Sequence, residues 1–363
     1  MQRVAQLAAA PHSWPAQVPR HDARSLSAAE LARLRRSGQP LLLTHALPEL
    51  DHGRWLSQLV RAAGDEPVVY QEQLGGVTEL YEARLRDALG ACAGASSHDA
   101  AVFLFDEELL PRCPPKLRLT PAAHPLFAGC DAGFAAFPRA LRPAPCCLLA
   151  GGLGARSSLH ADPYNWTGWN YCLEGTKLWT FFPAGPAADA ALRAVRKPPN
   201  AWSAGVELAA GWESPVDLYR AQGAQGGFLP SEPLPEALES GALRCRQAEG
   251  ELLLIPPAMW HQTYHEGPTL ATAGQFLDAA NARGVFAHIL AWCAAPAALL
   301  RRPGLRRLPL REQVQAVLVA ALQAKLGAAE GRELWRRLRA DSLRGALGRG
   351  GGVVRRKLLR RSL

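Results

Sequence analysis

Two residues in the middle of the chain have the types and the spacing of metal ligands. His160 and Asp162 stand two positions apart in the segment Leu159–Pro163. On a β-strand the side chains at positions i and i+2 point to the same face, so an imidazole and a carboxylate would project together. Two histidines and one carboxylate that leave coordination positions open are a ligand set for Fe(II). The pair therefore predicts an iron site that needs one more histidine.

His261 is the best candidate for the third ligand. It follows the apolar run Leu252–Ile255, which ends at a Pro-Pro turn before a new strand begins. Its distance along the chain from His160 suits opposite sides of a β-barrel, with the intervening strands between them. The alternative is that His160 and Asp162 are an incidental pair on a surface strand. His265, four positions later, would share a face with His261 on a helix and imitate a zinc motif. We interpret the segment as a strand and place His265 outside the site.

The elements that must position these residues are mostly short strands. With 33 Gly and 29 Pro the chain is rich in turns, which favours many short strands over a helical bundle. Residues 184–247 are irregular, and we interpret them as an insertion between strands. Glu174-Gly175 predicts a tight turn. Strands are predicted at 39–44, 66–70, 101–106, 146–150, 159–162, 168–172, 177–182, 251–255, 260–264 and 269–276.

Helical signals lie at both ends of the chain. Ser27 and Glu30 have the spacing of a capping box at the start of a helix, and residues 80–89 predict another helix. Residues 310–326 carry an apolar stripe that needs a partner, either within the chain or as a homodimer surface. We divide the chain into a disordered N-terminus, a catalytic domain, a C-terminal helical extension and a flexible basic tail. The boundaries are 1–24, 25–285, 286–347 and 348–363.

Composition and charge limit the classes of protein. Of 363 residues 48% are hydrophobic, and eight cysteines show no CxxC pair, which predicts reduced thiols. The apolar run 285–300 is too short for a membrane span of about 18 residues, so we expect a soluble protein. Residues 301–363 carry 17 Lys and Arg but only 4 Asp and Glu. This basic end predicts a solvated tail, with RNA contact or nuclear import as alternatives, and we expect nucleus or cytoplasm.

Several short motifs together resemble one known family. Lys177 lies in an apolar strand, which favours an inward-facing ammonium over an ordinary solvated lysine. The chain resembles the JmjC-domain (cupin-like) 2-oxoglutarate oxygenases, nearest the JmjC arginine demethylase/lysyl hydroxylase branch, over roughly residues 25 to 285. The matching text is Gly154 to Ser158, His160-Ala161-Asp162-Pro163, Gly168-Trp169-Asn170, Gly175-Thr176-Lys177-Leu178-Trp179, Phe182-Pro183, and Gly250-Glu251 through Pro256 to Trp260-His261.

The resemblance implies a fold and an activity. The fold would be α+β, with a double-stranded β-helix (jelly-roll, cupin) core, N-terminal helix and strand additions and a C-terminal helical extension. His160, Asp162 and His261 would bind Fe(II), Lys177 would hold the distal carboxylate of the co-substrate 2-oxoglutarate, and Asn170 would lie beside it. The reaction would use O2, with ascorbate in support, to hydroxylate a protein or peptide side chain, or to demethylate an N-methylated one by the same step.

Two positions depart from the family pattern. The resembled branch has an aromatic hydroxyl where this chain has Phe103, and a hydroxyl where it has Ala273. Losing two hydrogen bonds of about 0.5–1.5 kcal/mol each predicts co-substrate binding that is weaker by roughly tenfold or more. Tyr264, Thr272 or Gln275 are the candidates to compensate.

Two other hypotheses stay open. The first is a catalytically weak cupin-like scaffold that binds protein or RNA through its basic C-terminus, and the two departures favour it. The second is a cupin-type metalloenzyme that does not use the keto acid. Lys177 and Asn170 argue against that second hypothesis, because neither would then have an obvious role.

Overall fold

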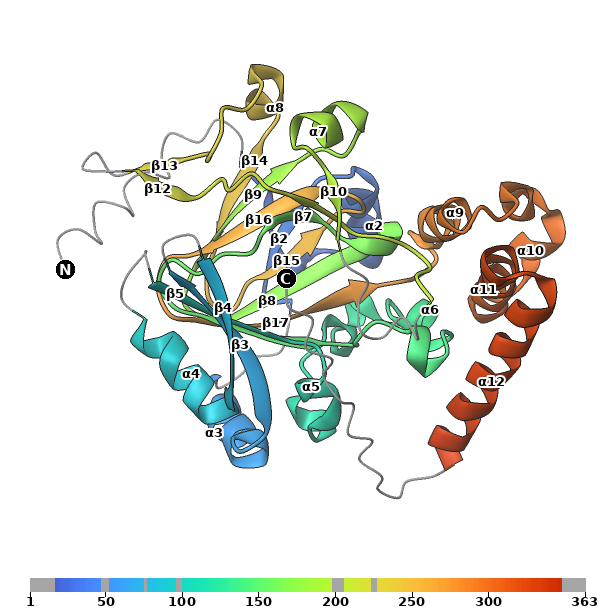
Figure 1. Cartoon of the computed structure of the whole chain (residues 1–363), viewed down its shortest axis with the longest axis horizontal. Helices are drawn as coiled ribbons and strands as arrows, with labels where there is room; N and C mark the ends of the chain where they lie inside the picture. Colours follow the sequence, from blue (N-terminus) through green and yellow to red (C-terminus); the bar gives the residue numbers. More distant parts are fainter. Residues whose placement is uncertain are drawn as a thin grey trace.

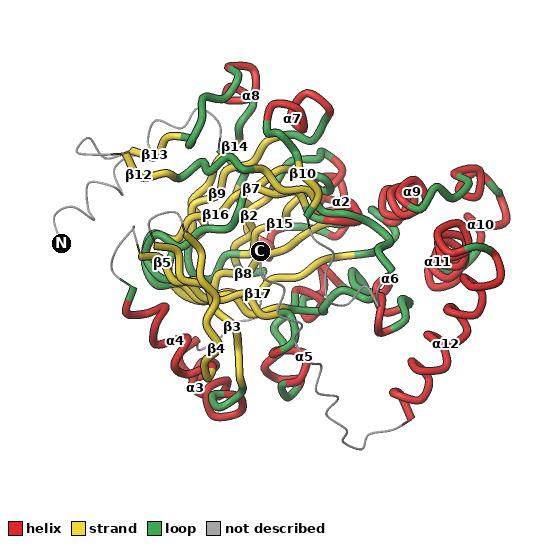
Figure 2. Tube along the Cα trace, viewed as in Figure 1, coloured by secondary structure: helices red, strands yellow, loops and turns green. Residues whose placement is uncertain are grey.

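Two large sheets form the centre of the molecule, and helices cover its outside. The computed structural model describes residues 17–46, 52–74, 77–95, 100–197, 206–222 and 227–347. Over these ranges the fold is α+β, as predicted, with sheets whose strands are almost all antiparallel. Figure 2 shows the strands gathered in the middle and the helices around them. The predicted tail at 348–363 lies outside the described residues.

The first sheet is mixed, with one parallel pair at its edge. Arg20–Asp22 pairs in parallel with Leu41–Thr44, and every other neighbouring pair is antiparallel. Its nine strands, in spatial order, are β1 (Arg20–Asp22), β2 (Leu41–Thr44), β15 (Leu252–Ile255), β8 (Thr167–Glu174), β17 (Thr269–Phe276), β6 (Cys147–Gly151), β5 (Ala100–Asp106), β3 (Pro67–Leu74) and β4 (Val77–Arg84).

The second sheet is wholly antiparallel and holds both candidate histidine ligands. A separate two-stranded ribbon of β12 (Arg220–Gln222) and β13 (Gly227–Leu229) lies in the insertion. The six strands of the second sheet, in spatial order, are β10 (Val195–Arg196), β11 (Trp212–Ser214), β7 (Leu159–Ala161), β16 (Trp260–His265), β9 (Lys177–Phe182) and β14 (Leu243–Gln247).

The chain alternates between the two sheets as it builds them. It passes from β6 in the first sheet to β7 in the second, then to β8 and β9 in the same alternation. After the insertion it enters the second sheet as β14 and alternates again through β15, β16 and β17. The predicted turn between β8 and β9 needs its glycine. Gly175 has φ +77°, and a Cβ there would stand 2.2 Å from the Pro268 carbonyl oxygen.

Most predicted strands are present, and β9 and β17 have the predicted bounds. Three predictions need correction. The predicted helix at 80–89 is strand β4 up to Arg84 and helix α4 (Leu85–Gly94) after it, because residues 77–84 pair along their whole length with β3. The insertion at 184–247 contributes core strand β14, which pairs with β9 over five positions. Residues 20–22, within the N-terminus predicted to be disordered, form β1, because they pair with β2.

Helices near the N-terminus cover one face of the first sheet. The predicted capping box is confirmed: Ser27 accepts from the Glu30 amide, and the Glu30 carboxylate accepts from the Ser27 amide. Helices α3 and α4 lie against the β3–β5 end of the sheet (Figure 1). The α-helices before the C-terminal group are α2 (Ala28–Arg36), α3 (His52–Ala63), α4 (Leu85–Gly94), α5 (Leu109–Arg112), α6 (Ala132–Ala135), α7 (Pro186–Ala191) and α8 (Glu236–Ser240).

The C-terminal helices share a core with the rest of the chain. The buried stripe of α11 packs in one cluster with α9 and with Tyr164 and Trp166, which follow the candidate ligand Asp162. The stripe is therefore an internal packing surface, and a homodimer through other parts of these helices stays a prediction. No described helix is long and apolar enough to cross a membrane. The helices are α9 (Ala282–Trp292), α10 (Pro303–Arg307), α11 (Leu310–Leu326) and α12 (Ala328–Leu347).

Candidate functional site

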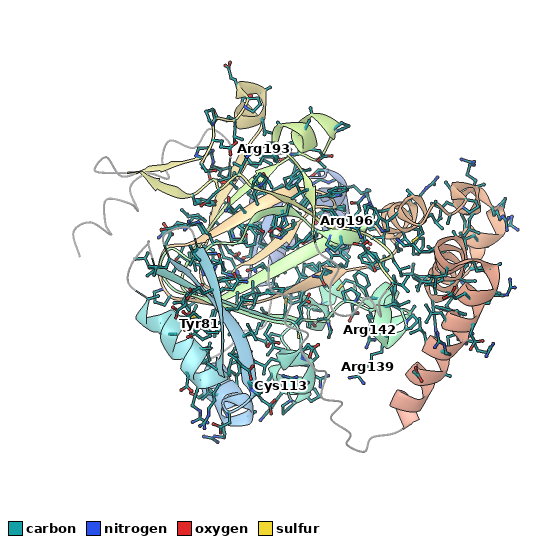
Figure 3. The ribbon with its side chains drawn as sticks, viewed as in Figure 1. Tyr81, Cys113, Arg139, Arg142, Arg193 and Arg196 are labelled. Carbon is teal, nitrogen blue, oxygen red and sulfur yellow. The ribbon has the colours of Figure 1, made fainter. Side chains whose placement is uncertain are left out.

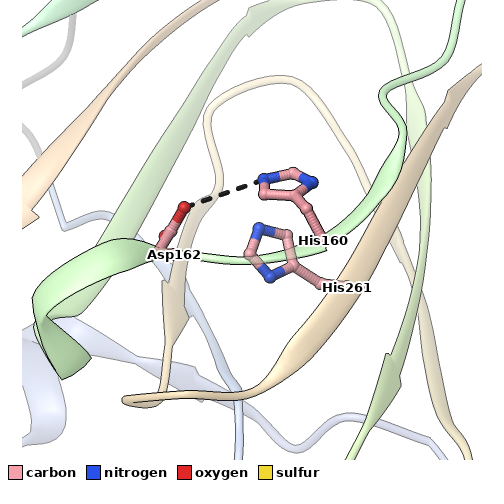
Figure 4. A group of neighbouring side chains, drawn as sticks. All are labelled: His160, Asp162 and His261. Carbon is pink, nitrogen blue, oxygen red and sulfur yellow. Dashed lines mark ion pairs between the residues drawn. The ribbon is translucent and has the colours of Figure 1, made fainter. Parts of the chain in front are cut away.

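The structure brings the three predicted metal ligands together. His160 on β7 lies directly opposite His261 on β16, and Asp162 follows at the end of β7. One ligand atom from each of the three residues lies within 4.8 Å of the others. His160 Nε2 is 3.7 Å from Asp162 Oδ1, and the two imidazole centroids are 4.2 Å apart (Figure 4). Two imidazoles and a carboxylate thus converge on one point, as a metal ion would require.

The backbone fixes which nitrogen of each imidazole is free. His160 Nδ1 donates to the Ser158 carbonyl oxygen at 2.8 Å, and His261 Nδ1 donates to the Met259 carbonyl oxygen at 3.0 Å. A carbonyl oxygen can only accept, so the hydrogen stays on Nδ1 in both rings. Each Nε2 then keeps its lone pair, the arrangement in which histidine binds a metal.

The electrostatic environment keeps His160 in its neutral form. Burial lowers the pKa of His160 well below its usual value, and the charges of Lys197 and His261 lower it further. Neutral imidazole is the form that coordinates metals, so no proton has to be displaced before an ion binds. Burial thus favours the metal-binding form of His160, and a carboxylate at Asp162 would add the charge that attracts a cation.

Lys177 lies deep in the interior with no acidic partner. Its side chain is 1% exposed, and its ammonium donates only to Asn170 Oδ1, at 3.4 Å. Among the described residues no carboxylate forms an ion pair with it. Burial lowers the pKa of Lys177 to about 8, against a smaller opposing effect of the thiols of Cys172 and Cys147. A buried ammonium without a counter-charge is costly, so this corner of the structure is suited to an anionic ligand.

His265 is a neighbour of Lys177 that the sequence reasoning set aside. It is not part of the metal cluster, as predicted, but it pairs with Lys177 across β16 and β9. Its side chain is fully buried and its Nε2 has no hydrogen-bond partner among the described residues, while Nδ1 lies 2.5 Å from Thr269 Oγ1. Only the register of β9 against β16 brings His265 next to Lys177, and local sequence patterns carry no signal for that register.

The two departures from the pattern of the resembled family both lie at the candidate site. Phe103 and Ala273 both line the cavity that holds the triad and Asn170, and neither can donate a hydrogen bond there. Ala273 lies opposite Asn170 in the β17–β8 register. Of the proposed substitutes, Tyr264 and Gln275 line the same cavity. Thr272 does not line it, since neighbouring residues on a strand point to opposite faces.

The cavity around the triad is large. Its volume is about 1050 Å³, enough to hold both a small co-substrate and a substrate side chain. It reaches from His160 to the β3–β4 hairpin, where Gln73 and Thr78 line it, and to Asp217 in the insertion. The cavity therefore joins the candidate metal ligands to the surface beside the hairpin. Glu107 also lines the cavity, and burial raises its pKa to about 7.

Comparison with known proteins agrees with the resemblance seen in the motifs. No protein-family model matches the chain. Two curated proteins, from Caenorhabditis briggsae and Caenorhabditis elegans, are each 24% identical to it over 183 residues. Both are named bifunctional arginine demethylase and lysyl-hydroxylase psr-1. The match covers 50% of this chain and 42% of each relative, so it spans less than half of their length. These homologues are consistent with a JmjC-like family.

Proposed function

We propose that the chain is an Fe(II)- and 2-oxoglutarate-dependent dioxygenase that hydroxylates a protein side chain, or demethylates an N-methylated one by the same step. One observation carries the proposal. His160, Asp162 and His261 converge with both Nε2 atoms free, in the same interior as an ammonium that lacks an anion. A metal site alone would not need Lys177, and a dicarboxylic keto acid gives it a partner.

The strand order supports a double-stranded β-helix as the core of this enzyme. The eight strands β6–β9 and β14–β17 alternate between facing sheets, which is the winding that such a barrel needs. On this basis we keep residues 25–285 as the catalytic unit. The match to psr-1 supports an oxidoreductase of the hydroxylase or demethylase kind.

The chain's own residues divide the work between two ends of the interior. His160, Asp162 and His261 would hold Fe(II), which supplies activation of O2 and the oxidative loss of carbon dioxide from the keto acid. Lys177 would pair with the distal carboxylate of 2-oxoglutarate, and Asn170 would orient the ammonium through the contact at 3.4 Å. His265 Nε2, which lacks a partner among the described residues, is placed to donate to the same carboxylate. The apolar walls at Phe103 and Ala273 would exclude water between the two ends.

The deciding experiment is succinate formation from 2-oxoglutarate by purified protein with Fe(II), ascorbate and no added substrate. We expect turnover in the wild type and none in His160→Ala or Lys177→Met. The matched controls are His45→Ala and Lys116→Ala, which remove an exposed histidine and an exposed lysine and should keep the activity. Calorimetry with Fe(II) and 2-oxoglutarate under nitrogen then measures binding without turnover.

A catalytically weak scaffold is the second candidate, because Phe103 and Ala273 remove two hydroxyls from the cavity. It predicts that the wild type binds metal but neither binds nor consumes 2-oxoglutarate. That result would sink the dioxygenase proposal. Metal binding and turnover of a substrate without any keto acid would favour the third hypothesis, a metalloenzyme of another class.

A further inference from the structure

Strand β4 is an open edge of the nine-stranded sheet. It is the last strand in the spatial order, and it pairs only with β3 among the described strands. Seven of its eight residues, all but Ala83, are exposed. The amide and carbonyl groups on its outer side therefore have no strand partner in the described part of the chain. Such a row of groups can pair with another extended chain. Figure 1 shows the β3–β4 hairpin at the outside of the fold.

The exposed edge is also apolar. Leu80 is 67% exposed, Val77 60% and Leu74, at the end of β3, 63%. Figure 3 shows Tyr81 on the same hairpin, where its ring stacks on Tyr70. Proteins usually protect such an edge with lysine, proline, a bulge or a covering segment. Strand β4 contains no lysine and no proline, and its register with β3 runs unbroken over eight pairs. The outer side of β4 is therefore open to pairing with a further strand.

Unpaired negative charge indicates what kind of partner fits. Glu72 on β3 lies directly opposite Glu79 on β4, and Glu82 follows on the other face. None of the three forms an ion pair with a lysine or arginine among the described residues. Like charges opposite each other in a sheet destabilise it, and a cationic side chain from a partner would relieve that repulsion. A second copy of the chain would bring the same glutamates and add to it.

The hairpin continues into the candidate active site. Gln71 lies opposite Leu80 on β4 and opposite Phe103 on β5, so the three side chains share one face of the sheet. That face is the wall of the cavity that holds the triad, since Phe103 and Gln71 line it and so does Thr78 of β4. A strand paired with β4 would therefore lie beside the opening of the cavity, with its next residues free to enter.

We propose that β4 is the docking edge for an extended basic segment of the substrate polypeptide. The segment adds to the sheet as a further antiparallel or parallel strand, its lysine or arginine side chains meet Glu79 and Glu82, and a residue beyond the segment reaches the cavity. The entry of that residue rests on the proposed function, whereas the docking of the segment does not.

The first test uses a fluorescent probe peptide that repeats Lys-Lys-Val-Val, about ten residues long, enough to span β4 and to present lysines on both faces of a strand. We expect saturable binding to the full chain, measured by polarisation without added metal. The variant Glu72→Gln/Glu79→Gln/Glu82→Gln should weaken it by roughly tenfold, since it removes the three charges that attract the lysines and each exposed pair adds only a modest amount. The matched control Glu236→Gln/Glu239→Gln changes exposed glutamates on α8 and should bind as the wild type does. Equal weakening in both variants would mean non-specific attraction and would overturn the proposal.

The second test addresses the backbone. The same probe, methylated at its central amide nitrogens, cannot form a sheet ladder and should lose binding, while hydrogen exchange at residues 77–84 should slow only with the unmodified probe. Undiminished binding of the methylated probe would refute strand addition. A chain that is dimeric in solution and becomes monomeric on Leu80→Asp would assign the edge to a second copy instead. None of these measurements requires turnover, so an inactive protein that binds the probe would refute the oxygenase and keep the docking edge.

Discussion

Two regions of the same interior differ in how their polar groups are paired. The metal corner consists of His160, Asp162 and His261, and the Lys177 corner consists of Lys177 and His265. At the metal corner the chain itself completes the hydrogen bonding, because Ser158 and Met259 carbonyls hold both imidazoles in the orientation that leaves Nε2 free. At the other corner an ammonium and an imidazole lie side by side, both buried, and no carboxylate pairs with either among the described residues.

The protein itself orients the side chains of the metal corner, whereas the charge of Lys177 has no counter-charge among the described residues. The metal corner costs the empty protein little, since a backbone carbonyl accepts from Nδ1 of each imidazole. The Lys177 corner costs stability until an anion arrives, because a buried charge without a partner is among the most unfavourable features of an interior. Under the proposed function an anionic ligand supplies the partner, so the stability of Lys177 variants is a test of that proposal. The predictions below start from the largest expected effect.

Removing one of the three candidate ligands should abolish tight metal binding. His261→Ala takes away one of three donors, and we expect Fe(II) or Co(II) affinity to fall by more than about 100-fold, beyond the loss that follows removal of a residue that only orients a metal ligand. Isothermal calorimetry measures it, with His45→Ala as the matched control. Unchanged metal affinity in His261→Ala would show that the three side chains converge without forming a site.

Lys177→Met should have two effects of opposite sign. Affinity for 2-oxoglutarate should fall by about 100-fold or more, because the distal carboxylate loses its only ammonium. The free energy of unfolding of the ligand-free variant should be about 1–3 kcal/mol higher than that of the wild type, because an unpaired buried charge is replaced by an apolar side chain of similar length. Denaturant titration and calorimetry check both. A destabilised variant would mean that Lys177 has a structural partner.

Affinity for 2-oxoglutarate should depend on pH through Lys177. The groups facing it are His265 on β16, and Cys172 and Cys147 on β8 and β6, all neutral near pH 8 because burial lowers the pKa of the histidine and raises those of both thiols. With the pKa of Lys177 at about 8, the dissociation constant should rise roughly tenfold from pH 7 to pH 9.

The same pKa fixes the sign of a stability effect. The unfolded chain keeps the lysine protonated up to about pH 10.4, so it binds more protons than the native state between pH 8 and that value. Stability of the ligand-free protein from this group should therefore increase with pH in that window. Lys177→Met should show neither the affinity change nor this increase, and a wild type with a flat affinity profile would contradict the assignment.

Restoring the missing hydroxyls should give the smallest change. Phe103→Tyr and Ala273→Thr each add one donor in the cavity, so each should tighten 2-oxoglutarate binding by about 2–10-fold. Ala100→Thr is the matched control, because Ala100 is exposed at the start of the same strand as Phe103 and does not line the cavity. No gain in either variant would indicate that Tyr264 or Gln275 already supplies the bond.

Local pattern predicted much of the fold, and the pairing of strands decided the rest. The apolar run 177–182, the turn before 269–276 and the spacing of His160 and Asp162 were enough to predict two strands and two donors. The helix predicted at 80–89 is wrong for residues 80–84, because only their pairing with β3 favours a strand there. The position of His265 beside Lys177, and of β14 in the core, depends on long-range register that local periodicity does not contain.

The shared core of the C-terminal helices sets the smallest unit worth producing in the laboratory. Helix α11 packs with Tyr164 and Trp166, a few residues from Asp162, and Trp292 of α9 contacts Trp212 on the strand next to β7. Trp292 also lies between the cations Arg196 and Lys325. A recombinant chain that stops at residue 285 would therefore expose an apolar face directly behind the metal ligands. Expression and crystallisation trials should keep the chain through α12.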